Sequence, residues 1–352
     1  MANGHDNNDY DWLYASDQAQ TRTQPMQPAQ SPGLSPPVLP SSGGKKPAKR
    51  RKSGLARLVV LLISAWLLFM IAVPLVAWQD LTRIDADPGE NRPAPGATTT
   101  FIIAGTDERP RDRSRGRTDT LMLLTFGAGP TVLTSIPRDS LVDVPGHGRT
   151  KVNAAFAYGG APLLVQTLEQ ETGLRLDGFV QVGFDSLVSV VDAVGGIEIC
   201  PERDLKDKDS KLDINAGCQL VDGQTALAYS RNRKSFPTGD IARGQSQREV
   251  IGGIGSAVLT PATILNPLRW AQENSSASSA LAVSPNVSMF EFARFAWALS
   301  NAMSGEGINC TVPIRDLRVT WDGDRANEYF THLRNGTASQ LDTLCTDSGL
   351  KD

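Results

Sequence analysis

Arginine residues gather between Tyr229 and Arg248, although the whole chain carries a formal net charge of −3. The stretch contains Arg231, Arg233, Arg243 and Arg248, together with the carboxylate of Asp240 and the amide of Gln247. Guanidinium groups bind phosphate oxygens bidentately and keep their charge at neutral pH. If the first part of the stretch is extended, Arg231 and Arg233 share a face. The stretch therefore predicts one wall of a phosphate or diphosphate site; a solvated basic helix face is the alternative.

Two aspartates are placed to complete such a site. Asp107 directly follows an apolar strand candidate, and Asp119 directly precedes the next one. If these strands are antiparallel neighbours, both carboxylates lie at the same edge of the sheet. Two carboxylates together with substrate phosphates are a typical way to hold Mg²⁺, so we expect a metal–diphosphate site there. Taken singly, an Asp at a strand end is more often a turn or capping residue.

Further cations flank these acids. Arg109 and Arg117 lie in the charged segment between the two strand candidates, and Arg138 follows a third. No GxxxxGK[ST] loop is present, so nucleotide hydrolysis of the P-loop type is unsupported. The three histidines are scattered along the sequence, which gives little support to a His-based metal site or a Ser-His-Asp triad. We interpret His147, in a Gly-rich loop, as structural or incidental.

The elements that must position these residues alternate between strands and helices. Strands are predicted at 101–104, 120–126, 132–136, 179–182, 197–199, 311–314 and 317–321, with a hairpin turn at 127–130. Helices are predicted at 151–158, 162–171, 185–194, 222–230, 240–251, 289–303 and 325–333, whereas 202–216 is charged and loop-like. This alternation favours an α/β layered domain.

The N-terminal part divides into three segments. Residues 1–57 are predicted to be a disordered cytoplasmic tail, rich in Gln, Pro and Ser, that ends in a basic run. Residues 58–78 carry no charge and are long enough to cross the roughly 30 Å hydrocarbon core as a helix. Residues 79–99 form a linker rich in Pro and Gly. Because the basic run precedes the span and acidic residues follow it, we expect a single-pass protein of the plasma membrane with the later residues outside.

A DNA-binding tail is another interpretation of the basic run, but the apolar span that follows argues against it, and the composition does not suggest nucleic-acid binding. The four cysteines form no CxxC pair, and their even number suggests two disulfides in an oxidising compartment. The simplest pairing is Cys200–Cys218 with Cys310–Cys345. Four cysteines allow three connectivities, and four buried thiols are the alternative.

Several ordered motifs resemble the LytR–CpsA–Psr family of cell-wall glycopolymer transferases, in its actinobacterial type. They are Gly105-Thr106-Asp107, Arg117-Thr118-Asp119-Thr120, Ser135-Ile136-Pro137-Arg138-Asp139, Lys151-Val152-Asn153-Ala154, the stretch from Asp192 to Gly196, Asp222-Gly223, and the arginine stretch up to Gln247. The resemblance implies an α/β/α three-layer sandwich around a mixed central sheet, with a hydrophobic groove for a polyprenyl chain, over residues 100–335. Residues 336–352 would be a C-terminal tail.

The resemblance also implies a role for each matching residue. The metal-binding acids are Asp107 and Asp119, holding Mg²⁺ with Mn²⁺ as an alternative, and the diphosphate-binding arginines are Arg117, Arg138, Arg231, Arg233 and Arg243. Lys151 and Gln247 lie near the head group. From the residues themselves, Arg109 and Asp240 are further candidates for substrate binding. No general base is evident: Asp139 or Asp240 could serve, but we favour a role for either in orienting an arginine. The family commonly has Arg immediately before this Gln, where Ser246 stands here, and Arg248 is a candidate to replace it in part.

The function implied is transfer of a glycopolymer, with its linking phosphate, from a polyprenyl diphosphate carrier to a peptidoglycan hydroxyl. A polyprenyl diphosphate phosphatase and a non-catalytic polyprenyl-lipid-binding wall protein are the alternatives; a transcription attenuator is opposed by the topology. The candidates for the lipid groove are Leu163, Leu164, Val165, Leu187, Val188, Val190 and Val191, although core packing accounts for most of them. The glycan, the acceptor position and the oligomeric state stay open.

Overall fold

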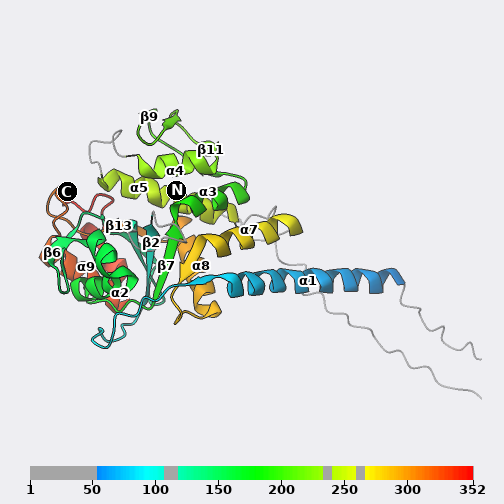
Figure 1. The fold of residues 1–352 in the computed structure, drawn as a ribbon, viewed down its shortest axis with the longest axis horizontal. Helices are drawn as coiled ribbons and strands as arrows, with labels where there is room; N and C mark the ends of the chain where they lie inside the picture. Colours follow the sequence, from blue (N-terminus) through cyan, green and yellow to red (C-terminus); the bar gives the residue numbers. More distant parts are fainter. Residues whose placement is uncertain (1–53, 107–117, 233–239, 259–265, 352) are drawn as a thin grey trace, which may run out of the picture. The chain divides into compact units, whose positions relative to one another are not determined.

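The computed structural model describes residues 54–106, 118–232, 240–258 and 266–351, and within them the side chains of 184–185, 240–243, 256 and 258 are not described (Figure 1). The predicted disordered tail therefore lies outside the described residues, apart from its last few positions. Those positions begin a long apolar helix, α1 (Gly54–Asp80), which contains Pro74. An 18-residue window of α1 has a mean hydropathy of 2.8, so its length and composition suit a membrane span.

A mixed sheet of seven strands organises the rest of the described chain. Its order is β1 (Thr82–Arg83), β12 (Leu281–Val283), β7 (Gly178–Gly183), β2 (Thr99–Thr106), β3 (Thr118–Phe126), β4 (Val132–Ser135) and β13 (Ile308–Thr311). β2 pairs antiparallel with β3 and parallel with β7, and β4 pairs parallel with β13. The strand ends that flank the predicted acids are therefore brought together, because Thr106 pairs with Thr118.

Both faces of this sheet are covered. Along β2, Phe101 and Ile103 belong to one apolar cluster, while Ile102 and Ala104 belong to another. Because successive strand residues point to opposite faces, the two clusters lie on opposite sides of the sheet. Helices α2 (Val152–Thr172) and α9 (Gly323–Asn335) cover one face, and α8 (Met289–Met303) covers the other (Figure 1). The predicted three-layer α/β/α sandwich with a mixed central sheet is confirmed.

Two glycines divide α2 at the place where two separate helices were predicted. Gly159 and Gly160 have non-helical backbone angles, and Gly160 adopts a positive φ of 65° that suits glycine. Pro162 then begins the second half. A short hairpin of β5 (Leu141–Val144) and β6 (Gly148–Lys151), absent from the sequence prediction, leads into α2.

A third apolar cluster lies under α3 (Phe184–Ala193), α4 (Gly223–Arg231) and α5 (Asp240–Val258). Two small hairpins complete it, β8 (Ile197–Ile199) with β11 (Gln219–Val221), and β9 (Leu205–Asp207) with β10 (Leu212–Ile214). The expectation that 202–216 is loop-like is therefore wrong. Its buried residues Leu205, Leu212 and Ile214 alternate with exposed charged residues, as strand geometry requires. Each strand has only 3 residues, so the charge-rich composition outweighed this short period in the prediction.

The strands of the C-terminal part differ from their prediction. The expected strand pair 311–314 and 317–321 is wrong, because β13 pairs with β4 and only an isolated bridge joins Ile314 to Trp321. The chain before β12 forms α7 (Pro267–Ala280), and short 3-10 helices at Ala338–Gln340 and Asp342–Leu344 follow α9. Both disulfides, Cys200–Cys218 and Cys310–Cys345, join the cysteines that the simplest pairing predicted.

Candidate active site

A polar pocket opens at the ends of β3 and β4, against the first half of α5 and the end of β13. It is lined by Asp119, Leu121, Met122, Ser135, Ile136, Pro137, Arg138, Gly244, Gln247 and Thr311. Three of the predicted site residues, Asp119, Arg138 and Gln247, therefore share one cavity. At Gly244 a Cβ atom would meet no described atom within 4 Å, so a larger residue here would extend into open space at the pocket wall.

Charges of alternating sign run along the edge of the polar pocket. The guanidinium of Arg138 forms an ion pair with Asp119, and its Nε atom lies 3.9 Å from Asp139 Oδ1. Lys151 Nζ lies 3.1 Å from the same carboxylate oxygen of Asp139. The Lys151 side chain is 54% exposed, so it stands at the outer end of this row. The arrangement suits an anion that replaces the carboxylates as the partner of the two cations.

The turn after β4 fixes Arg138 in this position. Ser140 N donates to Pro137 O, and Val152 N, at the start of α2, donates to Ser140 O at 2.8 Å. Asn153 N donates to the carbonyl oxygen of Arg138 at 3.3 Å. These bonds tie the Pro137–Ser140 turn to α2, which accounts for the proximity of the two separate sequence motifs that contain Arg138 and Lys151.

Three predicted residues, Asp107, Arg109 and Arg117, lie outside the described residues. Their chain segment nevertheless begins and ends at a known place, because Thr106 and Thr118 are paired neighbours in the sheet. Asp119 lies within β3, at the register shift between the Thr106–Thr118 and Gly105–Thr120 pairs, and Asp107 follows Thr106 in the sequence. The strand arrangement on which the two-carboxylate prediction depended is therefore present, although only Asp119 can be described.

The arginine stretch divides between two helices. Arg231 is the last residue of α4, with an exposed side chain, so the expectation that it lies on an extended segment is wrong. Arg233 lies outside the described residues. Asp240 begins α5 and Arg243 follows in its first turn, but their side chains are not described. Gln247, one turn after Arg243, is 7% exposed, and its Nε2 atom lies 3.5 Å from Ser230 O.

A second, apolar pocket adjoins the polar one through Gln247, which lines both. Its other lining residues are Ile103, Gly105, Thr120, Val182, Leu187, Ser230, Val250 and Ile251. Among the predicted groove residues only Leu187 lines this pocket, whereas Leu164, Val165 and Val191 are core residues. The sequence reasoning overlooked Ile103 and Val182, which lie on one face of their strands, because a strand that is buried on both sides shows no apolar alternation.

Other motif residues hold the helices that carry the site. Gly223 N donates to Asp192 Oδ1 at 2.8 Å, which fixes the start of α4 against α3. A Cβ atom at Gly223 would lie 2.4 Å from Val188 O, so the close contact between these helices requires glycine. Asp222 caps α4 by accepting from Thr225 N. These residues therefore support the site through the placement of α4.

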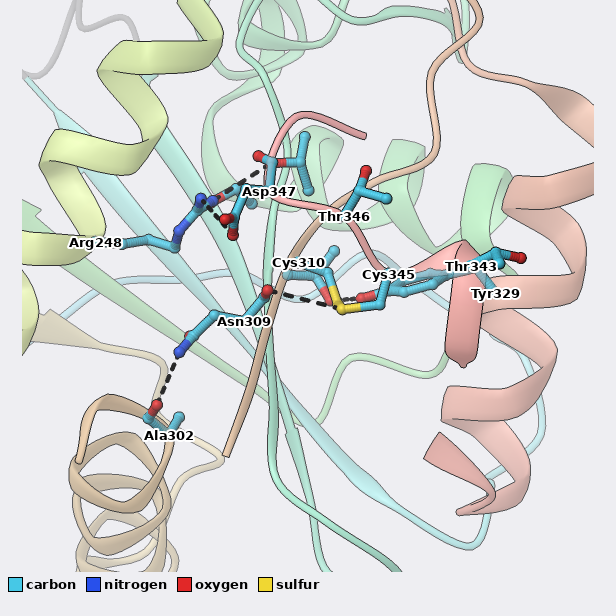
Figure 2. The surroundings of a disulfide bond; sticks show 12 residues. Arg248, Ala302, Asn309, Cys310, Tyr329, Thr343, Cys345, Thr346 and Asp347 are labelled. Carbon is cyan, nitrogen blue, oxygen red and sulfur yellow. Dashed lines mark hydrogen bonds and ion pairs between the residues drawn. A yellow bond between two sulfur atoms is a disulfide. The ribbon is translucent and has the colours of Figure 1, made fainter. Parts of the chain in front are cut away.

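Arg248 does not line the polar pocket, contrary to its suggested role as a replacement for the family arginine. The residue is only 6% exposed, and its Nη1 atom lies 2.5 Å from Ser135 Oγ and 3.4 Å from Thr311 Oγ1. Figure 2 shows Arg248 reaching from α5 toward Asp347, whose carboxylate is 4.0 Å away, beside the Cys310–Cys345 disulfide. Burial lowers the pKa of Arg248, and the guanidinium stays charged behind the pocket wall.

Ser246, at the position of the family arginine, is buried and hydrogen-bonded to Tyr229. The Tyr229 hydroxyl also donates to Glu249 Oε2, and Cys200 N donates to the other oxygen of Glu249. Burial raises the pKa of Tyr229 well above its ordinary value. Ser246 therefore belongs to a network that joins α4 and α5 to the Cys200–Cys218 loop.

The residues of the polar pocket suit a divalent cation in their chemistry. Asp119 offers hard carboxylate oxygens at the pocket edge, and the neighbouring strand ends at Thr106, the residue before Asp107 in the sequence. Elsewhere in the described ranges, Glu198, Cys200 and Cys218 lie close enough together to suggest a metal site. The two cysteines are joined in a disulfide, so they offer no thiolate to a metal.

Comparisons with known proteins agree with this geometry. The sequence model of the LytR_cpsA_psr family matches residues 82–330. The probable cell wall biosynthesis protein LcpB of Corynebacterium glutamicum is 36% identical over 322 residues, covering 85% of this chain and 76% of that protein. The polyisoprenyl-teichoic acid–peptidoglycan teichoic acid transferase TagU of Enterococcus faecalis is 37% identical over 169 residues, covering 47% of this chain and 55% of that protein.

A solved structure, the LytR-Csp2A-Psr enzyme from Actinomyces oris, superposes with a TM-score of 0.59 at 19% identity, covering 72% of this chain and 96% of that one. This similarity concerns the fold. The family match over residues 82–330 and the similarity to LcpB show that the chain belongs to the LytR–CpsA–Psr family.

Proposed function

We infer that this protein transfers a glycopolymer, with its linking phosphate, from a polyprenyl diphosphate carrier to a hydroxyl of peptidoglycan. One observation carries the proposal: a polar pocket with Asp119 and Arg138 adjoins an apolar pocket, and Gln247 lines both. A lipid diphosphate has the same division into a charged head and an apolar chain. Family membership and the names of LcpB and TagU support the same reaction.

In the proposed reaction a sugar hydroxyl attacks the phosphorus that bears the glycan. The new P–O bond forms as the bond to polyprenyl phosphate breaks, and the hydroxyl proton passes to solvent. Arg138 stabilises the charge on the transferring phosphoryl group, while Gln247 orients the diphosphate at the mouth of the apolar pocket. Arg117, Arg231, Arg233 and Arg243 are proposed as further partners of the diphosphate, and Lys151, Asp240 and Arg109 as supporting contacts.

Asp119 and Asp107 would hold Mg²⁺, with Mn²⁺ as an alternative; the ion would neutralise charge on the diphosphate. Arg138 pairs with Asp119 in the structure, so the two side chains would separate or share the substrate when it binds. Asp139 stays ion-paired between Arg138 and Lys151 and orients them. We propose no general base.

The proposed location is the plasma membrane, with α1 as a single span, residues 1–53 in the cytoplasm and the folded part outside. Two observations support this orientation. The basic run lies before α1, as the positive-inside rule requires. Both disulfides lie after α1, in the part that would meet an oxidising compartment.

The test uses the full chain in lipid nanodiscs with a polyprenyl-diphosphate glycan, Mg²⁺ and peptidoglycan fragments. We expect glycan attachment and polyprenyl monophosphate release that require both acceptor and metal, and a loss of about a hundredfold for Arg138→Ala. Arg318→Ala, an exposed arginine of the loop before α9, is the matched control. Release without acceptor would replace the transferase with a phosphatase, and tight lipid binding without release would indicate a carrier-binding protein.

A further inference from the structure

Helix α8 carries an apolar face that no described residue covers. Phe290 and Trp297 are 74% and 73% exposed. Arg294 lies between them, and the spacing of four and then three residues places all three on one side of the helix. We call these three residues the α8 face. Exposed Met289, Ala293 and Ala296 border it. Large apolar side chains gathered on one exposed helix face commonly mark an interaction surface.

The one acidic residue within α8, Glu291, is already engaged. Glu291 accepts a hydrogen bond from Ser288 N at 2.8 Å, completing the capping box at the start of α8. The two arginines near this face, by contrast, have exposed side chains. Arg294 is exposed, with its Cζ atom 5.5 Å from the Phe126 ring centroid, and Arg83 is exposed beside the end of α1. The surface therefore combines apolar side chains with positive charge.

The end of the membrane span lies against the same helix. Trp78 is the last apolar residue of the uncharged run in α1, and its ring centroid lies 5.4 Å from that of Phe292 in α8. The Cζ atom of Arg83 lies 4.2 Å from the Trp78 ring centroid. A Trp at the end of a span lies at the level of the lipid head groups. Because α8 contacts Trp78 directly, this helix lies close to the level of the lipid head groups.

We propose that the α8 face binds the surface of the lipid bilayer, in the leaflet where α1 ends. The inference rests on the proposed membrane span. Trp and Phe on one side of a helix enter the interface between head groups and acyl chains, and nearby arginines favour anionic lipids. Bilayer lipid fits better than a protein partner, because the opposite, core side of α8 packs through Phe292 against Trp78 at the end of the span, which holds the whole helix near the head-group level.

This docking has a consequence for the lipid substrate. The apolar cluster that contains Trp78, Phe292 and Phe295 also contains Ile103, Val182 and Ile251, which line the apolar pocket. Phe295 stacks on Phe101 of the sheet, with ring centroids 5.1 Å apart. With the α8 face on the bilayer, the apolar pocket lies on the same apolar cluster that packs against the end of the span. Docking would therefore hold the pocket close to the bilayer from which a polyprenyl chain enters.

The first experiment places a photoreactive benzoylphenylalanine at position 290 or 297 of the full chain. The matched control places it at Leu317, which is 63% exposed in a loop whose neighbours Val319 and Trp321 pack in the cluster on the other face of the sheet. The chain is reconstituted in nanodiscs of phosphatidylglycerol and phosphatidylethanolamine and irradiated. We expect lipid adducts at 290 and 297 at least tenfold above those at 317. Equal adducts at all three positions, or cross-links only to a second copy or another protein, would overturn the proposal.

The second experiment separates docking from the transfer reaction. Phe290→Glu with Trp297→Glu should lower transfer from a long-chain donor embedded in the bilayer at least tenfold. The same variant should use a water-soluble, short-chain donor within twofold of the wild type. Equal losses with both donors would assign these residues to folding or to the site. The adduct measurement does not depend on activity. If the proposed reaction is wrong, the adducts still test docking of α8 on the bilayer. If docking is wrong, transfer from the water-soluble donor still tests the reaction.

Discussion

The Nη1 atom of Arg248 lies 2.5 Å from the hydroxyl of Ser135, which lines the polar pocket. A buried cation therefore stands directly behind the proposed diphosphate site without entering it. The same guanidinium nitrogen reaches Thr311, another lining residue, at 3.4 Å. Thr311 Oγ1 in turn donates to Asp347 O at 2.6 Å. One wall of the pocket is thus held by contacts between α5, β4, β13 and the C-terminal segment.

We expect Arg248→Ala to lower the free energy of unfolding by about 2–4 kcal/mol, because it removes charge-assisted hydrogen bonds and leaves a cavity. The free energy of unfolding of Arg248→Lys should lie between those of the wild type and Arg248→Ala, since lysine keeps the positive charge but lacks the planar guanidinium group. The thermal midpoint of the full chain in detergent would measure this. Arg318→Ala, on an exposed arginine, should leave the midpoint unchanged; a similar loss in both variants would show that burial of Arg248 contributes little.

The two disulfides should differ in their effect on activity. Cys310→Ala with Cys345→Ala removes a link across 35 residues and should cost about 4 kcal/mol of stability, against about 3 kcal/mol for Cys200→Ala with Cys218→Ala across 18 residues. Only the first pair is next to a pocket residue, Thr311, so transfer measured below both unfolding transitions should fall mainly in that variant. Equal activity in the two variants would contradict this assignment.

Gln247 should affect turnover more than binding. Gln247→Leu keeps the size of the side chain and extends the apolar pocket, but it removes the one amide shared by the two pockets. A lost hydrogen bond to a charged group is worth about 1.5–3 kcal/mol, so we expect kcat to fall roughly tenfold to a hundredfold with little change in KM. Gln245→Leu, on an exposed neighbour in α5, is the control. A rise in KM alone would assign Gln247 to ground-state binding.

The cap of α4 should show a defined pH dependence. Hydrogen bonds from the side chain and the backbone of Thr225 lower the pKa of Asp222 below its ordinary value of 3.8. The ionised cap therefore stabilises the fold fully above this value, and the contribution disappears as the pH falls through the lowered folded-state pKa.

Asp222→Ala should accordingly lower stability by about 1 kcal/mol at neutral pH and by less at pH values below 3.8. Asp222→Asn keeps a capping oxygen without a titrating charge, so its stability should stay close to that of the wild type at neutral pH. Thermal midpoints of the three proteins across this pH range provide the measurement. A deficit of the alanine variant that stays constant down to the lowest pH would contradict an ionised cap.

The sequence predicted the central strands well because they are continuous apolar runs bounded by Gly, Pro and charged residues. β12 and β13 were missed or misplaced, since a strand of three or four residues is defined by the strands it pairs with more than by its own sequence. Asp119, Arg138 and Gln247 could be proposed from their motifs, and the structure places them in one pocket. Thr311 carried no comparable signal, and Arg248 was misjudged because its direction depends on Ser135 and Thr311, which are distant in sequence.

Thr311 follows all other residues of the polar pocket in the chain, and it arrives with β13, after α7, β12 and α8. If α1 spans the membrane as proposed, a ribosome makes the span long before it supplies this wall of the pocket. A nascent chain anchored at that stage would have the arginines of the earlier motifs but no closed pocket. Under the proposed function, binding of a lipid diphosphate would thus become possible only late in synthesis, and a product that stops before residue 311 would lack the completed pocket.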